Sequence, residues 1–254
     1  MSGTVYLVGA GPGAADLLTL RAARLLAEAD VVFYDALAPK EILVLAGRAE
    51  LVAVGKRSGR HATAQRFINK RLADAALEHR VVVRLKGGDP LVFGRAQEEI
   101  DFLRERGIAV EVVPGVTAAL AAGADLGVSL TQRGVARSLA FVTPRVGAGE
   151  APSTWVETAL AADTAVIYMG AGEAEAIAQA LIVAGKSPRT PVAVIENASL
   201  AEARTVLGTL ADLPEIAGRL SGGPVLIVVG EVLRKASGAS LSSLNKCSQT
   251  MRRA

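Results

Sequence analysis

The most informative part of the sequence is Val83-Arg84-Leu85-Lys86-Gly87-Gly88-Asp89-Pro90, in which an apolar strand runs directly into two glycines, a carboxylate and a proline. Glycine has no side chain and permits positive φ, and Pro90 fixes the backbone where the loop ends. Such a loop lays the backbone open beside a small ligand, and Asp89 supplies a charge that could grip a polyol or an ammonium. We therefore interpret residues 87–90 as the first candidate for a binding site.

On both sides of this stretch, short β-rich runs alternate with longer helical patterns. The helical patterns cover residues 20–29, 65–78 and 97–106, and the strands are expected at residues 4–8, 31–34, 51–54, 81–85 and 110–113. Strands separated by helices pair in parallel, because the helix carries the chain back to the same edge of the sheet. The first half of the chain is therefore predicted to be α/β.

The second half repeats this pattern after an alanine-rich helix at residues 118–124. Strands are expected at 139–143, 164–169, 192–196 and 225–229, with helices at 155–162 and 173–184, an antiparallel strand at 204–209 and a short helix at 214–220. We predict two α/β domains, residues 1–132 and 133–235, each with a largely parallel sheet flanked by helices. The serine-rich residues 236–254 have few large apolar groups and are predicted to form a flexible tail.

Composition excludes several classes of protein. The chain has 254 residues, of which 51% are hydrophobic and 21% charged, so it can bury a sizeable core. Cys247 is the only cysteine, which rules out a disulfide within the chain, and no export signal or membrane-length apolar run is visible. We expect a soluble, cytoplasmic protein. The net charge is +3, but only 4% of residues are aromatic, which favours a small anionic ligand over single-stranded nucleic acid.

A second glycine cluster, Gly9-Ala10-Gly11-Pro12-Gly13-Ala14, directly follows the first strand. Its spacing satisfies the dinucleotide fingerprint, with Asp35 in the place of the acid that binds ribose, so an oxidoreductase is one hypothesis. Pro12 has no amide hydrogen, however, and a loop that cradles a pyrophosphate needs backbone donors. The motif alone therefore does not assign a function.

Unusual residues follow several of the predicted strands. In parallel sheets the loops at the carboxyl ends of the strands carry the ligand site, and here those loops converge. They are residues 9–13, Asp35, Gly55-Lys56, residues 87–90, Pro114-Gly115-Val116-Thr117-Ala118 and Met169-Gly170. The sequence thus predicts a small-molecule site at one edge of the sheet. Neither His61 nor His79 has the spacing of a metal ligand, so no metal is expected.

Eight strings in this sequence resemble those of the tetrapyrrole methylases that use S-adenosylmethionine. Within that family they are most similar to the members that methylate uroporphyrinogen III, and the match runs from Tyr6 to about Val232. The strings are VGAGPG (8–13), LTL (18–20), YDAL (34–37), VGKR (54–57), RLKGGDPLVFGR (84–95), VPGVTAA (113–119), YMG (168–170) and ENAS (196–199).

The resemblance implies a two-domain α/β homodimer that transfers two methyl groups, to C2 and C7 of uroporphyrinogen III, giving precorrin-2 for cobalamin or sirohaem synthesis. It suggests Asp35 as proton acceptor and Lys56 as proton donor. It assigns contacts with S-adenosylmethionine to nine positions: Pro12, Gly87, Gly88, Asp89, Val92, Thr117, Ala118, Met169 and Ala198.

The substrate implied by the resemblance carries eight carboxylates, which guanidinium groups bind in a bidentate way that lysine cannot reproduce. We therefore take Arg57, Arg133 and Arg137 as candidate substrate-binding residues. Two other hypotheses remain at this stage, namely a methylase of the same fold that acts on RNA or on a protein side chain, and a nicotinamide-dependent oxidoreductase. Fold alone does not separate the three.

Overall fold

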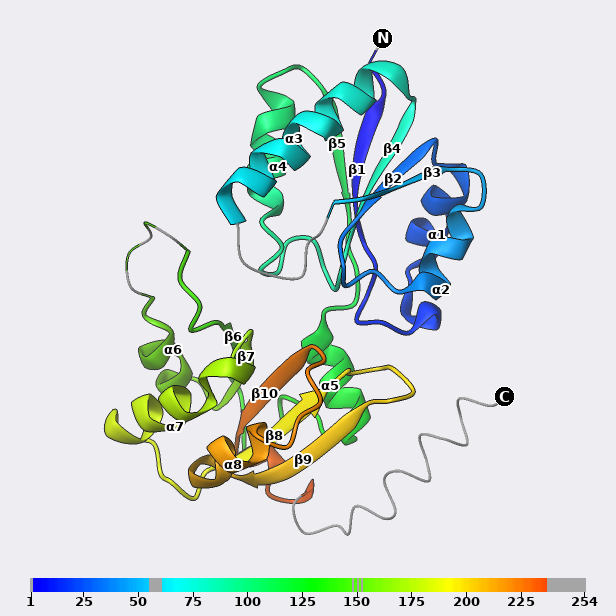
Figure 1. Cartoon of the computed structure of the whole chain (residues 1–254). Helices are drawn as coiled ribbons and strands as arrows, with labels where there is room; N and C mark the ends of the chain where they lie inside the picture. The colour runs from blue at the N-terminus through cyan, green and yellow to red at the C-terminus, as the bar shows by residue number, and fades with distance from the viewer. Residues whose placement is uncertain (1, 55–60, 148, 150, 152, 237–254) are drawn as a thin grey trace. The chain divides into compact units, whose positions relative to one another are not determined.

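The computed structural model describes residues 2–54, 61–147, 149, 151 and 153–236. The chain divides into two compact units, residues 1–117 and 118–254, and each is described by itself (Figure 1). The predicted division lay before Arg133. The difference arises because residues 118–132 pack with the second sheet, through buried side chains such as Ala122, Leu126 and Leu130.

The first unit contains an all-parallel sheet of five strands in the order β3-β2-β4-β1-β5. In chain order the strands are β1 (Thr4–Gly9), β2 (Val31–Tyr34), β3 (Glu50–Ala53), β4 (Val81–Lys86) and β5 (Ala109–Val113). All five were predicted within one or two residues, because each is an apolar run bounded by polar or glycine residues. The parallel order places the carboxyl ends of β4, β1 and β5 side by side.

Helices cover both faces of this sheet (Figure 1). Thr19 caps the N-terminus of α1 (Leu20–Glu28), since its hydroxyl accepts a hydrogen bond from the amide of Ala22 at 3.1 Å. The short helices over residues 40–46 were not predicted. The helical segments are η1 (Ala15–Leu17), α1 (Leu20–Glu28), α2 (Lys40–Leu43), η2 (Val44–Ala46), α3 (His61–Glu78) and α4 (Ala96–Arg104).

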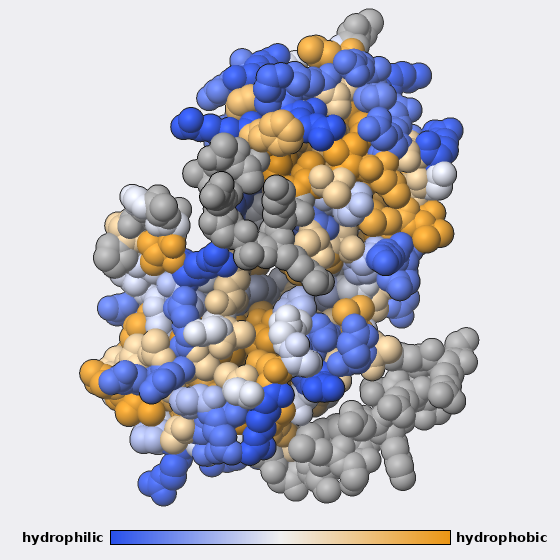
Figure 2. Space-filling model, in the orientation of Figure 1, coloured by the Kyte–Doolittle hydropathy of each residue, from blue (hydrophilic) through white to orange (hydrophobic). Residues whose placement is uncertain are grey.

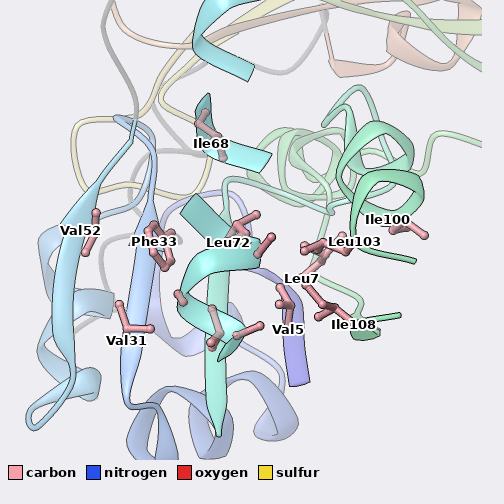
Figure 3. Close-up of a cluster of buried hydrophobic side chains, with 14 of the residues drawn as sticks. Val5, Leu7, Val31, Phe33, Val52, Ile68, Leu72, Ile100, Leu103 and Ile108 are labelled. Carbon is pink, nitrogen blue, oxygen red and sulfur yellow. The ribbon is translucent and has the colours of Figure 1, made fainter. Parts of the chain in front are cut away.

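One face of the first sheet packs against α3 and α4 (Figure 3). Leu7 on β1, Leu72 on α3 and Leu103 on α4 are completely buried in this cluster, and Phe33 packs beside them from β2. On the other face, α1 and the 40–46 segment bury Leu25, Leu26 and Ile42. The sheet is therefore fixed from both sides, and its loops extend from a rigid base.

The second unit contains a mixed sheet in the order β6-β7-β10-β8-β9. Only β6 and β7 pair in parallel, whereas β10 runs antiparallel to both β7 and β8, and β9 antiparallel to β8. This corrects the expectation of a second largely parallel sheet. β7 and β8 do run in the same direction, as the helix between them requires, but β10 lies between them. The strands are β6 (Leu139–Val142), β7 (Thr164–Tyr168), β8 (Pro191–Glu196), β9 (Arg204–Thr209) and β10 (Val225–Gly230).

Helices again cover both faces of the second sheet (Figure 1). On one face α5 (Ala118–Leu126) packs against β10 and its neighbours. The other face is covered by α6 (Trp155–Ala161), α7 (Ala174–Val183) and α8 (Leu213–Ala217). The unit also contains the 3-10 turns η3 (Ala171–Glu173), η4 (Leu210–Asp212) and η5 (Glu231–Leu233). Both predicted domains are thus α/β, which confirms the fold class.

Exposed apolar side chains gather on one side of the first unit. Figure 2 shows an apolar surface where Figure 1 draws α1 and α2, and Leu37, Val44 and Leu45 are among the exposed side chains of this region. Among the described residues, none of the helices combines the length and the apolar character that crossing a membrane would require.

The core facing α3 generates a first prediction. Leu72→Ala should lower the free energy of unfolding by about 2–5 kcal/mol, because the removed side chain is fully buried and leaves a cavity. Leu77→Ala in the same helix is the matched control, since Leu77 is 73% exposed. That control should change the free energy by no more than about 0.5 kcal/mol. Urea denaturation followed by circular dichroism measures both, and equal effects would contradict the described packing.

Candidate active site

Three glycine-containing loops meet at the carboxyl ends of β1, β4 and β5. The Gly11 amide donates to the Gly88 carbonyl at 3.1 Å, and the Gly88 amide donates back to the Gly11 carbonyl at 2.7 Å. A Cβ atom added to Gly9 would lie 2.6 Å from Gly115, and one added to Gly115 would lie 2.3 Å from the Gly88 carbonyl oxygen. The loops approach this closely only because no side chains stand between them.

Asp89 ties two of these loops together. Its Oδ1 accepts a hydrogen bond from the Leu91 amide at 2.8 Å, and its Oδ2 accepts one from the Gly115 amide at 3.0 Å. Both carboxylate oxygens therefore help to shape the loops. The contact of Asp89 with a ligand, which its charge and the family resemblance predict, remains a prediction.

The other predicted contacts in the first unit lie on the same loops. Pro12 is half-buried between Gly11 and Gly13, both of which have positive φ. Gly87 and Val92 are half-buried, and Thr117 is buried at the end of the loop that follows β5. The structure therefore brings the predicted residues of this unit to one edge of the sheet.

The first glycine loop does not have the geometry of a dinucleotide site. In that fold the helix begins at the glycine loop, so that its N-terminus faces the pyrophosphate. Here a 3-10 turn separates the loop from α1, which begins only at Leu20. The fingerprint spacing of Gly9, Gly11 and Ala14 is present, but the helix N-terminus that would bind the pyrophosphate is not at the loop.

Asp35 follows β2 at the same edge of the sheet. Its Oδ1 accepts a hydrogen bond from the Leu37 amide at 3.0 Å, and its Oδ2 lies 3.8 Å from Nη2 of Arg84. The Asp35 side chain is 26% exposed, whereas that of Arg84 is 5% exposed. The Asp35 carboxylate is thus held by neighbouring groups while part of it stays accessible.

Behind Asp35 lies a buried cluster of charged side chains that the sequence analysis missed. Glu99 of α4 is completely buried and accepts hydrogen bonds from Arg84 Nε at 3.2 Å, Lys86 Nζ at 3.0 Å and Gln65 Nε2 at 3.1 Å. A signal was present in the sequence. Arg84 and Lys86 are two residues apart in an apolar strand, so both point to one face and need a buried anion there.

The burial of Lys86 lowers the pKa of its ammonium group below the ordinary value, and the positive charge of Arg84 lowers it further. The carboxylates of Glu99 and Asp35 act in the opposite direction. Two cations share Glu99 as their buried anion, and Asp35 is the second carboxylate within reach of Arg84. The cluster therefore connects the strand before the Gly87-Gly88 loop with the candidate proton acceptor.

The predicted proton donor Lys56 and the candidate substrate-binding residue Arg57 lie outside the described residues. Their roles stay predictions. Among the residues that the structure describes, no group of three or more His, Cys, Asp and Glu side chains is placed to hold a metal ion.

In the second unit, predicted contacts gather where β7 and β8 end. Both strands run antiparallel to β10, so their carboxyl ends lie at one edge of the sheet. Met169 follows β7 with a φ of 57°, and Ala198 follows β8 between two residues of positive φ. Ala118 opens α5, whose next residue, Ala119, donates its amide to the Tyr168 hydroxyl at 3.1 Å. The three predicted residues of this unit therefore belong to one edge.

Arg133 and Arg137 lie elsewhere in this unit. Both are exposed and precede β6, and the Arg137 amide donates to Asp163, which precedes β7, at 2.8 Å. Because β6 and β7 are parallel, these arginines lie at the edge opposite to Met169. Arg145 follows β6 and therefore belongs to the edge of Met169. Within the second unit, the predicted arginine pair is not beside the predicted cofactor contacts.

A surface hollow of about 420 Å³ in the second unit is separate from these residues. It is lined by α5, the turn that follows it and the start of β6, and its lining contains none of the predicted site residues. The site is therefore assigned from the loops, not from the hollow.

Comparisons with known proteins place this geometry in a family. A family model described as tetrapyrrole (corrin/porphyrin) methylases matches residues 4–214. The chain belongs to this family. The resemblance drawn from the sequence strings is thereby confirmed, and the match spans both α/β units.

Individual relatives agree with this assignment. The siroheme synthase of Chromobacterium violaceum is 48% identical over 241 residues, which cover 94% of this chain and 51% of that protein. This chain spans about half the length of the curated relatives it matches.

Two solved structures from Thermus thermophilus are similar over most of their length. One is the native uroporphyrin III C-methyl transferase, with a TM-score of 0.80, 42% identity and coverage of 91% of this chain and 94% of that one. The other is that transferase complexed with S-adenyl homocysteine, with a TM-score of 0.79, 44% identity and coverage of 91% and 99%.

The buried cluster generates a second prediction. Glu99→Gln should destabilise the protein by about 3–5 kcal/mol, because Arg84 and Lys86 would lose their shared buried anion. Glu98→Gln on the same helix is the matched control. Glu98 pairs with Arg95 at the surface, where its side chain is 51% exposed, so the loss should stay below about 1 kcal/mol. Urea denaturation compares the two variants, and a Glu99 variant as stable as the control would refute the assigned network.

Proposed function

We propose that this protein transfers methyl groups from S-adenosylmethionine to C2 and C7 of uroporphyrinogen III, giving precorrin-2 and S-adenosylhomocysteine. The observation that carries the proposal is the match, over 91% of this chain at 44% identity, to a uroporphyrin III methyl transferase complexed with the demethylated cofactor. Family membership also favours methyl transfer over the nicotinamide hypothesis, and so does the 3-10 turn that separates the glycine loop from α1.

The glycine loops fit a bound nucleoside. Gly88 is half-buried, its φ is +67°, and a Cβ atom added to it would meet nothing within 4 Å. Its backbone therefore faces open space, where an adenosyl group could approach closely. Of the proposed cofactor contacts, six belong to the first unit, namely Pro12, Gly87, Gly88, Asp89, Val92 and Thr117, and three belong to the second, namely Ala118, Met169 and Ala198.

The cofactor supplies a methyl group that its sulfonium already activates, so the protein mainly has to position an electron-rich pyrrole carbon. Positioning of this kind can contribute about 7–11 kcal/mol to catalysis. The rigid, closely packed loops described above suit that task. No metal is needed for the transfer.

The substrate must also lose or relocate protons, and we assign this work to Asp35 and Lys56. Asp35 is partly exposed, so a substrate could reach it, and the guanidinium of Arg84 at 3.8 Å helps to hold the carboxylate in place. Lys56 is proposed as the donor on the strength of the family resemblance.

A direct assay tests the proposed reaction. Incubation with freshly prepared uroporphyrinogen III and methyl-labelled S-adenosylmethionine should give labelled product with the chromophore of a dimethylated tetrapyrrole. Labelling of RNA or of protein side chains in place of the tetrapyrrole would refute the substrate assignment. Calorimetry that detects no binding of S-adenosylhomocysteine would refute the cofactor assignment.

Asp35→Ala should retain its affinity for S-adenosylhomocysteine and lose most of its turnover, because the proton acceptor is gone. A general base typically contributes a factor of about 10²–10⁴. Asp30→Asn is the matched control, since Asp30 lies at the opposite end of β2 and caps the amides of Arg80 and Val81. Steady-state kinetics at saturating cofactor measures the difference, and full activity of the Asp35 variant would remove that residue from the chemistry.

If Arg133 and Arg137 bind the carboxylates of the substrate, replacing them should change the affinity for the substrate alone. Replacing both Arg133 and Arg137 with alanine should raise KM for uroporphyrinogen III by at least about tenfold, since removing a hydrogen bond to a charged group costs on the order of 1 kcal/mol or more. The Kd for S-adenosylhomocysteine should not change. An unchanged KM would refute this role for the two arginines.

We also propose that the protein is a homodimer, as the family resemblance implies. The exposed apolar surface over residues 37–45 would gain from being covered by another chain. Sedimentation velocity gives the mass in solution directly, and a monomer at micromolar concentration would refute this part of the proposal.

A further inference from the structure

The loop that carries Ala198 has an unusual backbone. Asn197 has a φ of 56° and Ser199 a φ of 73°, so both lie in the left-handed region that residues with side chains seldom occupy. Such backbone persists only where the surroundings hold it, and it is concentrated at ligand sites. Neighbouring groups must therefore hold this loop in its shape.

Glu196, the last residue of β8, is the main holding group. Its side chain is completely buried. It accepts hydrogen bonds from the Ser221 amide at 2.9 Å, the Ser221 hydroxyl at 2.9 Å and the Gly223 amide at 2.8 Å. Burial acts to raise the pKa of this carboxyl group, but these donors outweigh it and lower the pKa below the ordinary value. The carboxylate thus fixes the segment 221–224 that leads into β10.

This segment in turn holds the 197–199 loop. The Asn197 amide donates to the Pro224 carbonyl at 2.9 Å. A Cβ atom added to Gly223 would lie 2.2 Å from Asn197 Oδ1, so the two residues pack without any spare room. On the other side of the loop, the Ser199 amide donates to Asp125 Oδ2 at 2.7 Å. Glu196 therefore acts on the shape of the 197–199 loop through the segment 221–224.

The position of the loop connects it to the cofactor site. It follows β8 at the sheet edge where Met169, also in left-handed backbone, follows β7. The strain in this unit is thus concentrated where the cofactor contacts are proposed.

We propose that Glu196 is a positioning residue for the methyl donor: by holding the segment 221–224, it fixes the backbone of residues 197–199 in the shape that receives the donor at Ala198. This inference rests on the proposed function, because it takes S-adenosylmethionine as the ligand. A carboxylate suits the role, since it accepts all three hydrogen bonds at once. A glutamine side chain offers only one oxygen and turns its own N–H groups toward the donors.

The test compares Glu196→Gln with Asp212→Asn. Asp212 is an exposed carboxylate near the opposite end of β8, and like Glu196 it holds a turn: its Oδ2 accepts hydrogen bonds from the Thr209 amide at 2.9 Å and the Thr209 hydroxyl at 2.7 Å. In both substitutions, an amide side chain replaces a carboxylate that holds a turn. Only the first lies beside the proposed donor site.

Isothermal titration calorimetry with S-adenosylhomocysteine gives the main readout. Glu196→Gln should raise Kd by at least about tenfold, and Asp212→Asn should leave Kd within about twofold of the unmodified protein. The KM for S-adenosylmethionine should rise in parallel for the Glu196 variant, while kcat at saturating donor stays within about threefold. Thermal unfolding of both variants shows whether a loss of stability accompanies the change.

A milder variant covers the case in which Glu196→Gln does not fold. Ser221→Ala removes one of the three donors and leaves the carboxylate in place, and it should raise Kd by about threefold. The proposal is overturned if the Glu196 variant or, in its place, the Ser221 variant binds with unchanged Kd, or if Asp212→Asn weakens binding as much. Failure of the unmodified protein to bind S-adenosylhomocysteine is a different result, because it refutes the proposed donor itself.

Discussion

The candidate site depends on the contact of glycine backbone with glycine backbone at the carboxyl ends of β1, β4 and β5. Gly9, Gly88 and Gly115 stack so closely that a single methyl group at Gly9 or Gly115 would overlap a main-chain atom of the neighbouring loop. The hydrogen bonds between Gly11 and Gly88, and those that Asp89 accepts, then fix the loops in register. The parallel order β4-β1-β5 is what brings these three loops together.

Behind these loops the protein keeps charge in its interior. Glu99 forms salt bridges with Arg84 and Lys86, and Arg84 also lies 3.8 Å from the partly exposed Asp35. Buried ion pairs seldom add stability compared with apolar packing, so stability alone does not account for this cluster. In the second unit, Glu196 and Asp125 accept hydrogen bonds from uncharged donors in and beside the 197–199 loop. Each unit therefore has a completely buried carboxylate, Glu99 in the first and Glu196 in the second, that organises the charged or polar groups around it.

Much of this could be predicted from the sequence, because hydrophobic periodicity places strands and helices, and parallel order places their loops. The partners of single side chains could not. The apolar stripe of α4 at Ala96, Ile100 and Leu103 places Glu99, and not Glu98, on the buried face, but it does not tell which cations meet Glu99 there. The sequence also did not show that Asp89 accepts the Leu91 amide within its own loop and the Gly115 amide of the loop after β5. The direction of β10 was also missed, because an apolar run carries no mark of its orientation.

The central place of β10 has a consequence for how the molecule is made. During synthesis the first sheet has all of its strands once residue 113 has emerged from the ribosome, so that unit can fold early. The second sheet cannot close, because β7 and β8 have no partner between them until residues 225–230 emerge. Until then both strands present open edges, which makes this half the one that needs protection from aggregation while the chain is being translated.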